Sequence, residues 1–157
     1  MTTLSPRILS DLMGHALTEA QAALAHDDVP IGAVVARLSD GAIVASAHNE
    51  RELRGDPTRH AEVLALQTAA RAVGGWRLGG HALVSTIEPC PMCAGAAWAA
   101  RVDLLVFGAA DPRAGAAGSI YNFAADPRLN HEITVVPGIR SDECAALVAQ
   151  FFAARRG

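Results

Sequence analysis

Two short motifs constrain this chain more than any other part of its sequence: residues 60–62 (HAE) and residues 88–93 (EPCPMC). Cysteines at positions i and i+3 can direct both sulfurs to one point when they open a helix, and Pro91 suits the first helical position because it lacks an N–H. One imidazole and two thiolates make a zinc site that leaves one tetrahedral position for water. The pattern predicts that His60, Cys90 and Cys93 bind one Zn²⁺ per subunit.

An open metal position calls for a nearby group that carries protons. A zinc ion lowers the pKa of bound water toward ~7, but the released proton still needs an acceptor. Glu62 follows His60 by two residues, and such residues diverge by about 200° around a helix. Both reach one site only over the first turn of a helix, which we expect to have Thr58 as its N-cap. The spacing predicts Glu62 as the catalytic proton shuttle.

A lone C-x-x-C motif also occurs in redox pairs and in structural zinc sites. The redox interpretation leaves His60 and Glu62 without a role. A structural zinc site needs a fourth protein ligand, and Cys144 is the only other cysteine. Cys144 is spaced with Leu147 and Phe151 as on the apolar face of a helix, which predicts a buried, inert thiol.

The composition bounds the class of protein. A chain of 157 residues, 51% of them hydrophobic, suits a single domain over residues 1–157. A net charge of −3 argues against a large electrostatic footprint for nucleic acid, although all 13 basic residues are arginines, whose forked group suits phosphate. Three cysteines make no disulfide framework, and neither a signal peptide nor an apolar run of ~20 residues is present. We expect a cytoplasmic protein without a membrane segment.

The order of predicted elements indicates the fold class. We expect helices over residues 6–26, from residue 60, after Cys93 and over residues 141–155, with a charged loop at 50–56 and a short helical turn at 119–124. We expect strands over residues 31–38, 42–47, 81–87, 102–107 and 131–136, the first two as a hairpin. The segment 102–107 follows a helix and should pair parallel to its predecessor. These elements predict a three-layer α/β fold with a central mixed five-stranded sheet and helices on both faces.

The two motifs resemble the H-x-E…P-C-x-x-C signature of the zinc nucleoside and nucleobase deaminases. Further segments, including residues 29–34, 115–119 and 142–147, resemble the bacterial tRNA-specific adenosine deaminase family, and the similarity runs from about Leu9 to Arg156. The resemblance implies a cytidine-deaminase-like fold and hydrolytic conversion of adenosine to inosine at the wobble position of a tRNA anticodon. It also implies a homodimer, with the small-residue helix after Cys93 in the interface.

The resemblance further implies which residues bind substrate: Asn49, Ala61, Pro89, Asp111, Phe152, Arg155 and Arg156. On spacing alone, Asn49 is a turn residue after a strand. For Phe152 a core position, and for the two arginines a solvated helix end, stay open as equal alternatives to contact with RNA. Two rival functions stay open. A deaminase of a free base or nucleoside, such as guanine, cytosine or cytidine, would share the zinc site and suit the mildly acidic charge. A non-catalytic zinc module that binds nucleic acid would need four protein ligands.

Overall fold

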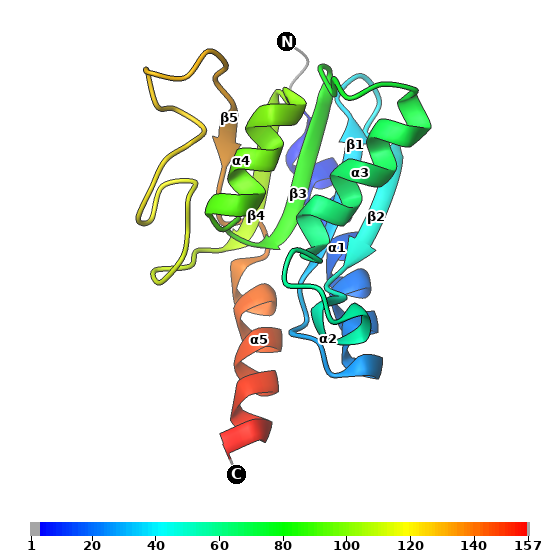
Figure 1. Ribbon diagram of the computed structural model, residues 1–157, viewed down its shortest axis with the longest axis vertical. Coiled ribbons are helices and arrows are strands. Elements are labelled where there is room, and N and C mark those ends of the chain that lie inside the picture. Colours follow the sequence, from blue (N-terminus) through cyan, green and yellow to red (C-terminus); the bar gives the residue numbers. More distant parts are fainter. Residues whose placement is uncertain (1–3, 157) are drawn as a thin grey trace.

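The computed structural model describes residues 4–156. The strands are β1 (Gly32–Arg37), β2 (Ile43–His48), β3 (His81–Ile87), β4 (Leu104–Ala109) and β5 (Thr134–Val136). The helices are α1 (Pro6–Ala22), the 3₁₀ turn η1 (Ala23–His26), α2 (Arg51–Arg54), α3 (Ala61–Val73), α4 (Pro91–Ala100) and α5 (Ser141–Arg156). The strands form one sheet in the order β2-β1-β3-β4-β5 (Figure 1).

Helices cover both faces of this sheet. Helices α3 and α4 pack on one face, over Val35, Leu83 and Leu105, whereas α1 and the start of α5 pack on the other, over Val34 and Val84. Successive strand residues point to opposite faces, so β1 and β3 feed both cores and are apolar along most of their length. The predicted three-layer α/β fold with a mixed five-stranded sheet is confirmed.

The strand directions bring residues 60–62 and 88–93 to the same end of the sheet, where the carboxyl ends of most of the strands lie. Strand β1 is antiparallel to β2 and β3, as the predicted hairpin requires, while β3 is parallel to β4 and β4 is parallel to β5. The carboxyl ends of β3 and β4 therefore lie at the same edge, and ligands bind at such ends in open α/β sheets. The turn at 88–90 and the loop at 110–119 both start there.

Several boundaries differ from the prediction. Strand β4 begins two residues later than expected, and β5 is shorter. The segment 119–124 contains no helical turn; Ala117 instead forms an isolated bridge with Asn122. The charged segment 50–56 holds the four-residue helix α2, which is too short to show a periodic pattern.

The start of α3 was also predicted wrongly. His60, not Thr58, is its N-cap. Asp56 Oδ1 accepts from the Thr58 N–H at 2.9 Å, so Thr58 belongs to a local turn. The Ala61 N–H donates instead to Asn49 Oδ1 at 2.9 Å. A residue distant in sequence therefore caps α3, which brings Asn49 next to the zinc-site motif.

A glycine permits α1 to lie close to β1, and this gives a testable prediction. A Cβ at Gly32 would stand 2.0 Å from the Ala16 carbonyl oxygen and 2.6 Å from the Ala20 nitrogen. Backbone atoms cannot yield easily, so Gly32→Ala is expected to lower the free energy of unfolding by about 1–3 kcal/mol. Urea denaturation measures this. Gly79→Ala, whose Cβ meets no atom within 4 Å, serves as control; equal losses in both variants would contradict the packing argument.

No helix within residues 4–156 is long and apolar enough to cross a membrane.

Candidate active site

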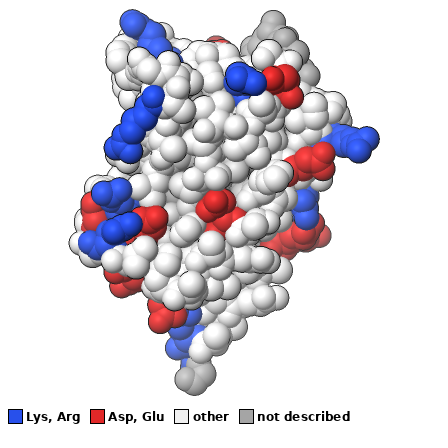
Figure 2. Space-filling model, turned by 90° about the vertical axis from the view of Figure 1, so that its right-hand side faces the viewer, with Lys and Arg blue, Asp and Glu red and all other residues white. Residues whose placement is uncertain are grey.

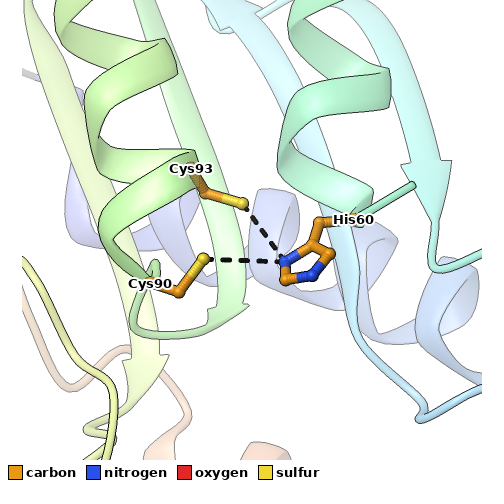
Figure 3. Close-up of side chains that lie close together, drawn as sticks. All are labelled: His60, Cys90 and Cys93. Atoms are coloured by element: carbon orange, nitrogen blue, oxygen red, sulfur yellow. Dashed lines mark hydrogen bonds between the residues drawn. The ribbon is translucent and has the colours of Figure 1, made fainter. Parts of the chain in front are cut away.

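His60, Cys90 and Cys93 point toward one another at the start of two neighbouring helices (Figure 3). The His60 Nδ1 atom lies 3.6 Å from the Cys90 sulfur and 3.5 Å from the Cys93 sulfur. An ion ~2.3 Å from each sulfur and ~2.0 Å from the nitrogen, at tetrahedral angles, separates these atoms by about 3.5 Å. The three side chains therefore have the spacing of a zinc site.

Local sequence explains this placement. His60 is the N-cap of α3 and Cys90 the N-cap of α4, with Pro91 at the first helical position. The two helices pack side by side through small residues, including Ala65 and Ala97. Both ligand sets thus lie at helix N-termini, where free N–H groups and the helix dipole favour negative charge.

The electrostatics of the two thiols are coupled. The pKa of Cys90 is lowered to about 4, because Cys93 donates a hydrogen bond to it and His60 adds another. The pKa of Cys93 is raised, since it shares its proton with Cys90 and is buried. The Cys90 thiolate also raises the pKa of His60. A metal binds both sulfurs as thiolates, so its binding releases the proton that the pair holds.

Glu62 supplies an acidic group with one oxygen that no protein atom in the described residues satisfies. Its side chain is 4% exposed, and within residues 4–156 its Oε1 atom has no hydrogen-bond partner. Burial raises the pKa of its carboxyl group. A buried polar atom without a partner costs about 1–3 kcal/mol, so such atoms generally face a ligand or water. With the zinc donors beside it, Glu62 fits the predicted proton shuttle.

These groups lie at a pocket of about 260 Å³. Its lining includes Asn49, His60, Glu62, Cys90, Asp111 and Phe152. They come from the end of β2, the two helix starts, the loop after β4 and helix α5. Five segments that are distant in sequence thus meet at the site that the motifs predicted.

Two predicted substrate residues have structural partners as well. Asn49 is 3% exposed; its Oδ1 caps Ala61, and its Nδ2 donates to the Val29 carbonyl at 3.1 Å. One Nδ2 hydrogen is left over, because an amide nitrogen carries two. Asp111 Oδ1 accepts from the backbone N–H groups of Arg113 and Ala114, at 2.9 and 3.2 Å. Each side chain therefore shapes the pocket wall through its own contacts.

The residues predicted on α5 separate into two groups. Phe152 is 41% exposed and lines the pocket, so it is not a core residue. Arg155 forms an ion pair with Asp27 at 2.7 Å and lies over the Phe151 ring at 3.4 Å. Neither Arg155 nor the exposed Arg156 is among the residues that line the pocket.

Ala61 and Pro89 act through their backbones. Ala61 donates to Asn49, and the Pro89 carbonyl accepts from the Ala116 N–H at 2.8 Å.

Arg51 on α2 lines the pocket, in agreement with one of the two roles open to the charged loop, substrate contact or a solvated loop. Glu88 at the end of β3 lines it as well, and sequence reasoning gave Glu88 no role. Burial opposes ionisation of Glu88, but hydrogen bonds from Ser119 and from backbone N–H groups outweigh it and lower the pKa of this carboxyl group. An acidic residue that ends an otherwise apolar strand was the available signal.

The structure does not support the alternative of a structural zinc site, which needs a fourth protein ligand. Within the part of the chain that the structure describes, no further His, Cys, Asp or Glu joins His60, Cys90 and Cys93. Cys144 is buried in α5, where its sulfur packs against Gly108 of β4. The prediction of a buried thiol is confirmed.

Comparison with known proteins agrees with the geometry. The chain is 44% identical over 140 residues to the tRNA-specific adenosine deaminase of Bacillus subtilis, covering 89% of this chain and 86% of that protein. A solved structure from studies of A-to-I editing by tRNA:A34 deaminases aligns with a TM-score of 0.83 and 39% identity, covering 88% of this chain and 99% of that one. The guanine deaminase of Nitrosomonas europaea aligns with a TM-score of 0.77 and 25% identity, covering 98% and 96%.

Residues 6–109 match the family model described as the cytidine and deoxycytidylate deaminase zinc-binding region. This segment contains all three side chains that have the spacing of a zinc site. The cofactor is therefore one Zn²⁺, and the resemblance seen in the motifs is confirmed. The chain belongs to the cytidine and deoxycytidylate deaminase zinc-binding family.

Proposed function

We propose that this protein hydrolyses adenosine to inosine at the wobble position of a tRNA anticodon and releases ammonia. The observation that carries the chemistry is the buried Glu62 Oε1 atom, which has no hydrogen-bond partner in residues 4–156 and belongs to a side chain that lines the same pocket as His60 and Cys90. The substrate is supported by relatives that are named tRNA-specific adenosine deaminases. The similarity to a guanine deaminase supports the second candidate, a free base, more weakly because the identity is lower.

In the proposed mechanism, His60, Cys90 and Cys93 hold the zinc ion. Zinc, when bound, lowers the pKa of a coordinated water toward ~7. Glu62 Oε1 would take one proton from the attacking water and pass it to N1 of the purine ring, and would then carry the second proton of that water to the departing amine. Water supplies the oxygen of inosine, and the amino group leaves as ammonia. Burial raises the pKa of the Glu62 carboxyl group, which favours its taking up a proton.

The pocket favours an unstacked base. The C6 atom of adenine is inaccessible in a stacked helix, whereas an anticodon loop presents single-stranded bases. The second Nδ2 hydrogen of Asn49 is available for an acceptor on the base, and the exposed ring of Phe152 offers a surface for stacking. We infer that Asp111 forms the opposite wall and that Arg155 and Arg156 lie near the RNA backbone.

We do not expect electrostatic attraction to dominate the binding of RNA to this protein. Figure 2 shows one face of the molecule, on which blue and red side chains are intermixed and lie mainly toward the margins. No continuous basic surface crosses this face. With a net charge of −3, we expect affinity to come from the shape of the pocket and a few arginines, so binding should depend only weakly on salt.

One assay tests the substrate. The zinc-loaded protein is incubated with an anticodon stem-loop carrying adenosine at the wobble position, and inosine is measured. A matched stem-loop carries adenosine only in its paired stem, and free adenosine, cytidine and guanine are assayed for ammonia. We expect product from the first RNA alone. Ammonia from guanine without inosine from the RNA would favour the free-base alternative.

We propose that the protein acts as a homodimer in the cytoplasm, where tRNA is found, with α4 in the interface. Exposed apolar groups on this side include Met92 on α4 and Val73 and Trp76 at the end of α3. A side chain at Gly95 meets no atom within 4 Å in the protomer. Gly95→Arg is therefore expected to shift sedimentation from dimer to folded monomer, while Gly79→Arg leaves the dimer intact. A wild-type protein that sediments as an active monomer would exclude this assembly.

A further inference from the structure

The carboxylate of Glu88 holds a single segment of the chain. It is 3% exposed at the end of β3, and both of its oxygens are used. Oε1 accepts from the Asp111 N–H at 3.0 Å and from the Ser119 hydroxyl. Oε2 accepts from the N–H groups of Ala117 and Ser119, at 3.1 and 3.0 Å. All four donors belong to residues 111–119.

Apart from Glu88, this segment is held by turn hydrogen bonds, by one from the Ala116 N–H to the Pro89 carbonyl, and by the bridge between Ala117 and Asn122. It contains no helix or strand, and it crosses the edge of the sheet where β4 ends. A Cβ at Gly115 would lie 2.3 Å from the Glu88 carboxyl carbon, so the backbone passes directly over the carboxylate. Glycine allows this close approach because it has no side chain. The segment is therefore folded around Glu88.

Glu88 also belongs to the turn that carries the zinc ligands. Its N–H donates to the Ala109 carbonyl at 2.9 Å, and Cys90 follows two residues later. The segment that it holds contributes Asp111 and Ala114 to the pocket lining. Glu88 thus connects the metal-ligand turn to the segment that contributes Asp111 and Ala114 to the pocket lining.

We propose that Glu88 is a positioning residue, which sets the distance between the substrate-facing wall at residues 111–119 and the zinc ligands. The inference rests on the proposed deaminase function for its kinetic consequences. Both carboxylate oxygens of Glu88 are taken up by residues 111–119, so Glu88 acts through Asp111 and not on the reacting atoms directly. Its loss should therefore weaken substrate binding more than the chemical step.

The variant Glu88→Gln isolates this role because it keeps the shape of the side chain. The amide oxygen can take the place of Oε2 and accept from Ala117 and Ser119. The amide NH₂ then faces the Asp111 N–H and the Ser119 hydroxyl. The hydroxyl can turn and accept, but the Asp111 N–H has no acceptor. The substitution is therefore expected to release the Asp111 end of the segment.

Hydrogen exchange of the zinc-loaded protein tests the positioning without any substrate. In Glu88→Gln, the Asp111 amide should exchange at least tenfold faster than in the wild type, with zinc still at one per chain. Asp126→Asn is the matched control, since Asp126 Oδ1 also accepts a backbone N–H, from Arg128 at 2.9 Å, in a different loop. Unchanged exchange at Asp111, or loss of zinc, would overturn the proposal even if the protein has another substrate.

Kinetics with the anticodon stem-loop test the consequence. A displaced binding wall should raise KM by about 10- to 100-fold in Glu88→Gln, with a smaller effect on kcat. In the double variant with Asp111→Ala, the loss should be close to the larger single loss, because both changes act on one element. If the losses of the two single variants multiply in the double variant, or if KM of Glu88→Gln equals that of the wild type, Glu88 does not act through residues 111–119.

Discussion

Replacing Glu62 by glutamine is expected to lower kcat for deamination by about 10²- to 10⁴-fold while zinc stays bound. Glutamine keeps the size of the side chain but cannot take a proton from water or return one. Glu62 is not in the group of side chains that have metal-ligand spacing, so the zinc content should stay at one per chain. Single-turnover rates and metal analysis of the same preparation measure both quantities.

The stability of this variant is informative as well. The Glu62 Oε1 atom is buried without a hydrogen-bond partner among the described residues, and burial opposes its charge. A neutral amide removes that charge penalty, so the melting temperature should not fall. Functional sites commonly hold groups that cost stability. Glu132→Gln, at an exposed acidic residue before β5, is the control. Appreciable turnover by Glu62→Gln would refute the assigned role.

The zinc ligands could be predicted because their chemistry is local. Two sulfurs three residues apart at a helix start already point to one place, and Pro91 marks that start. Strands that are buried on both faces can likewise be predicted, because they form continuous apolar runs in the sequence. Fold class and metal site therefore follow from short stretches of sequence and from the few residue types that bind zinc.

The supports of the site could not be predicted in the same way. Asn49 caps α3 from twelve residues away, and Glu88 holds a segment that begins 23 residues later. Such hydrogen bonds depend on tertiary placement. The local pattern marks Glu88 only as an acid that ends an apolar strand, and it does not distinguish Asn49 from a turn asparagine. The wrong N-cap at Thr58 has a local cause, because the Thr58 N–H donates to Asp56 Oδ1 in a turn that precedes the helix.

Replacing Cys93 by serine is expected to remove zinc and abolish activity, whereas Cys144→Ala should keep both. A serine hydroxyl is not ionised near neutral pH, and thiolate is the sulfur form that binds metal. Cys93 is one of the three donors that lie within 4.8 Å of one another, whereas Cys144 is outside that group. Metal analysis after dialysis against a weak chelator measures the zinc that each variant retains.

Thermal unfolding provides a second measurement of the same difference. A metal that binds only the folded chain stabilises it, so the melting temperature of the wild type and of Cys144→Ala should rise with added zinc. The melting temperature of Cys93→Ser should respond much less. Cys144→Ala leaves a small cavity against Gly108 and should melt somewhat lower at every zinc concentration, with the zinc-dependent rise unchanged. Loss of zinc from Cys144→Ala would indicate a fourth sulfur ligand, and the open coordination position that deamination requires would then be absent.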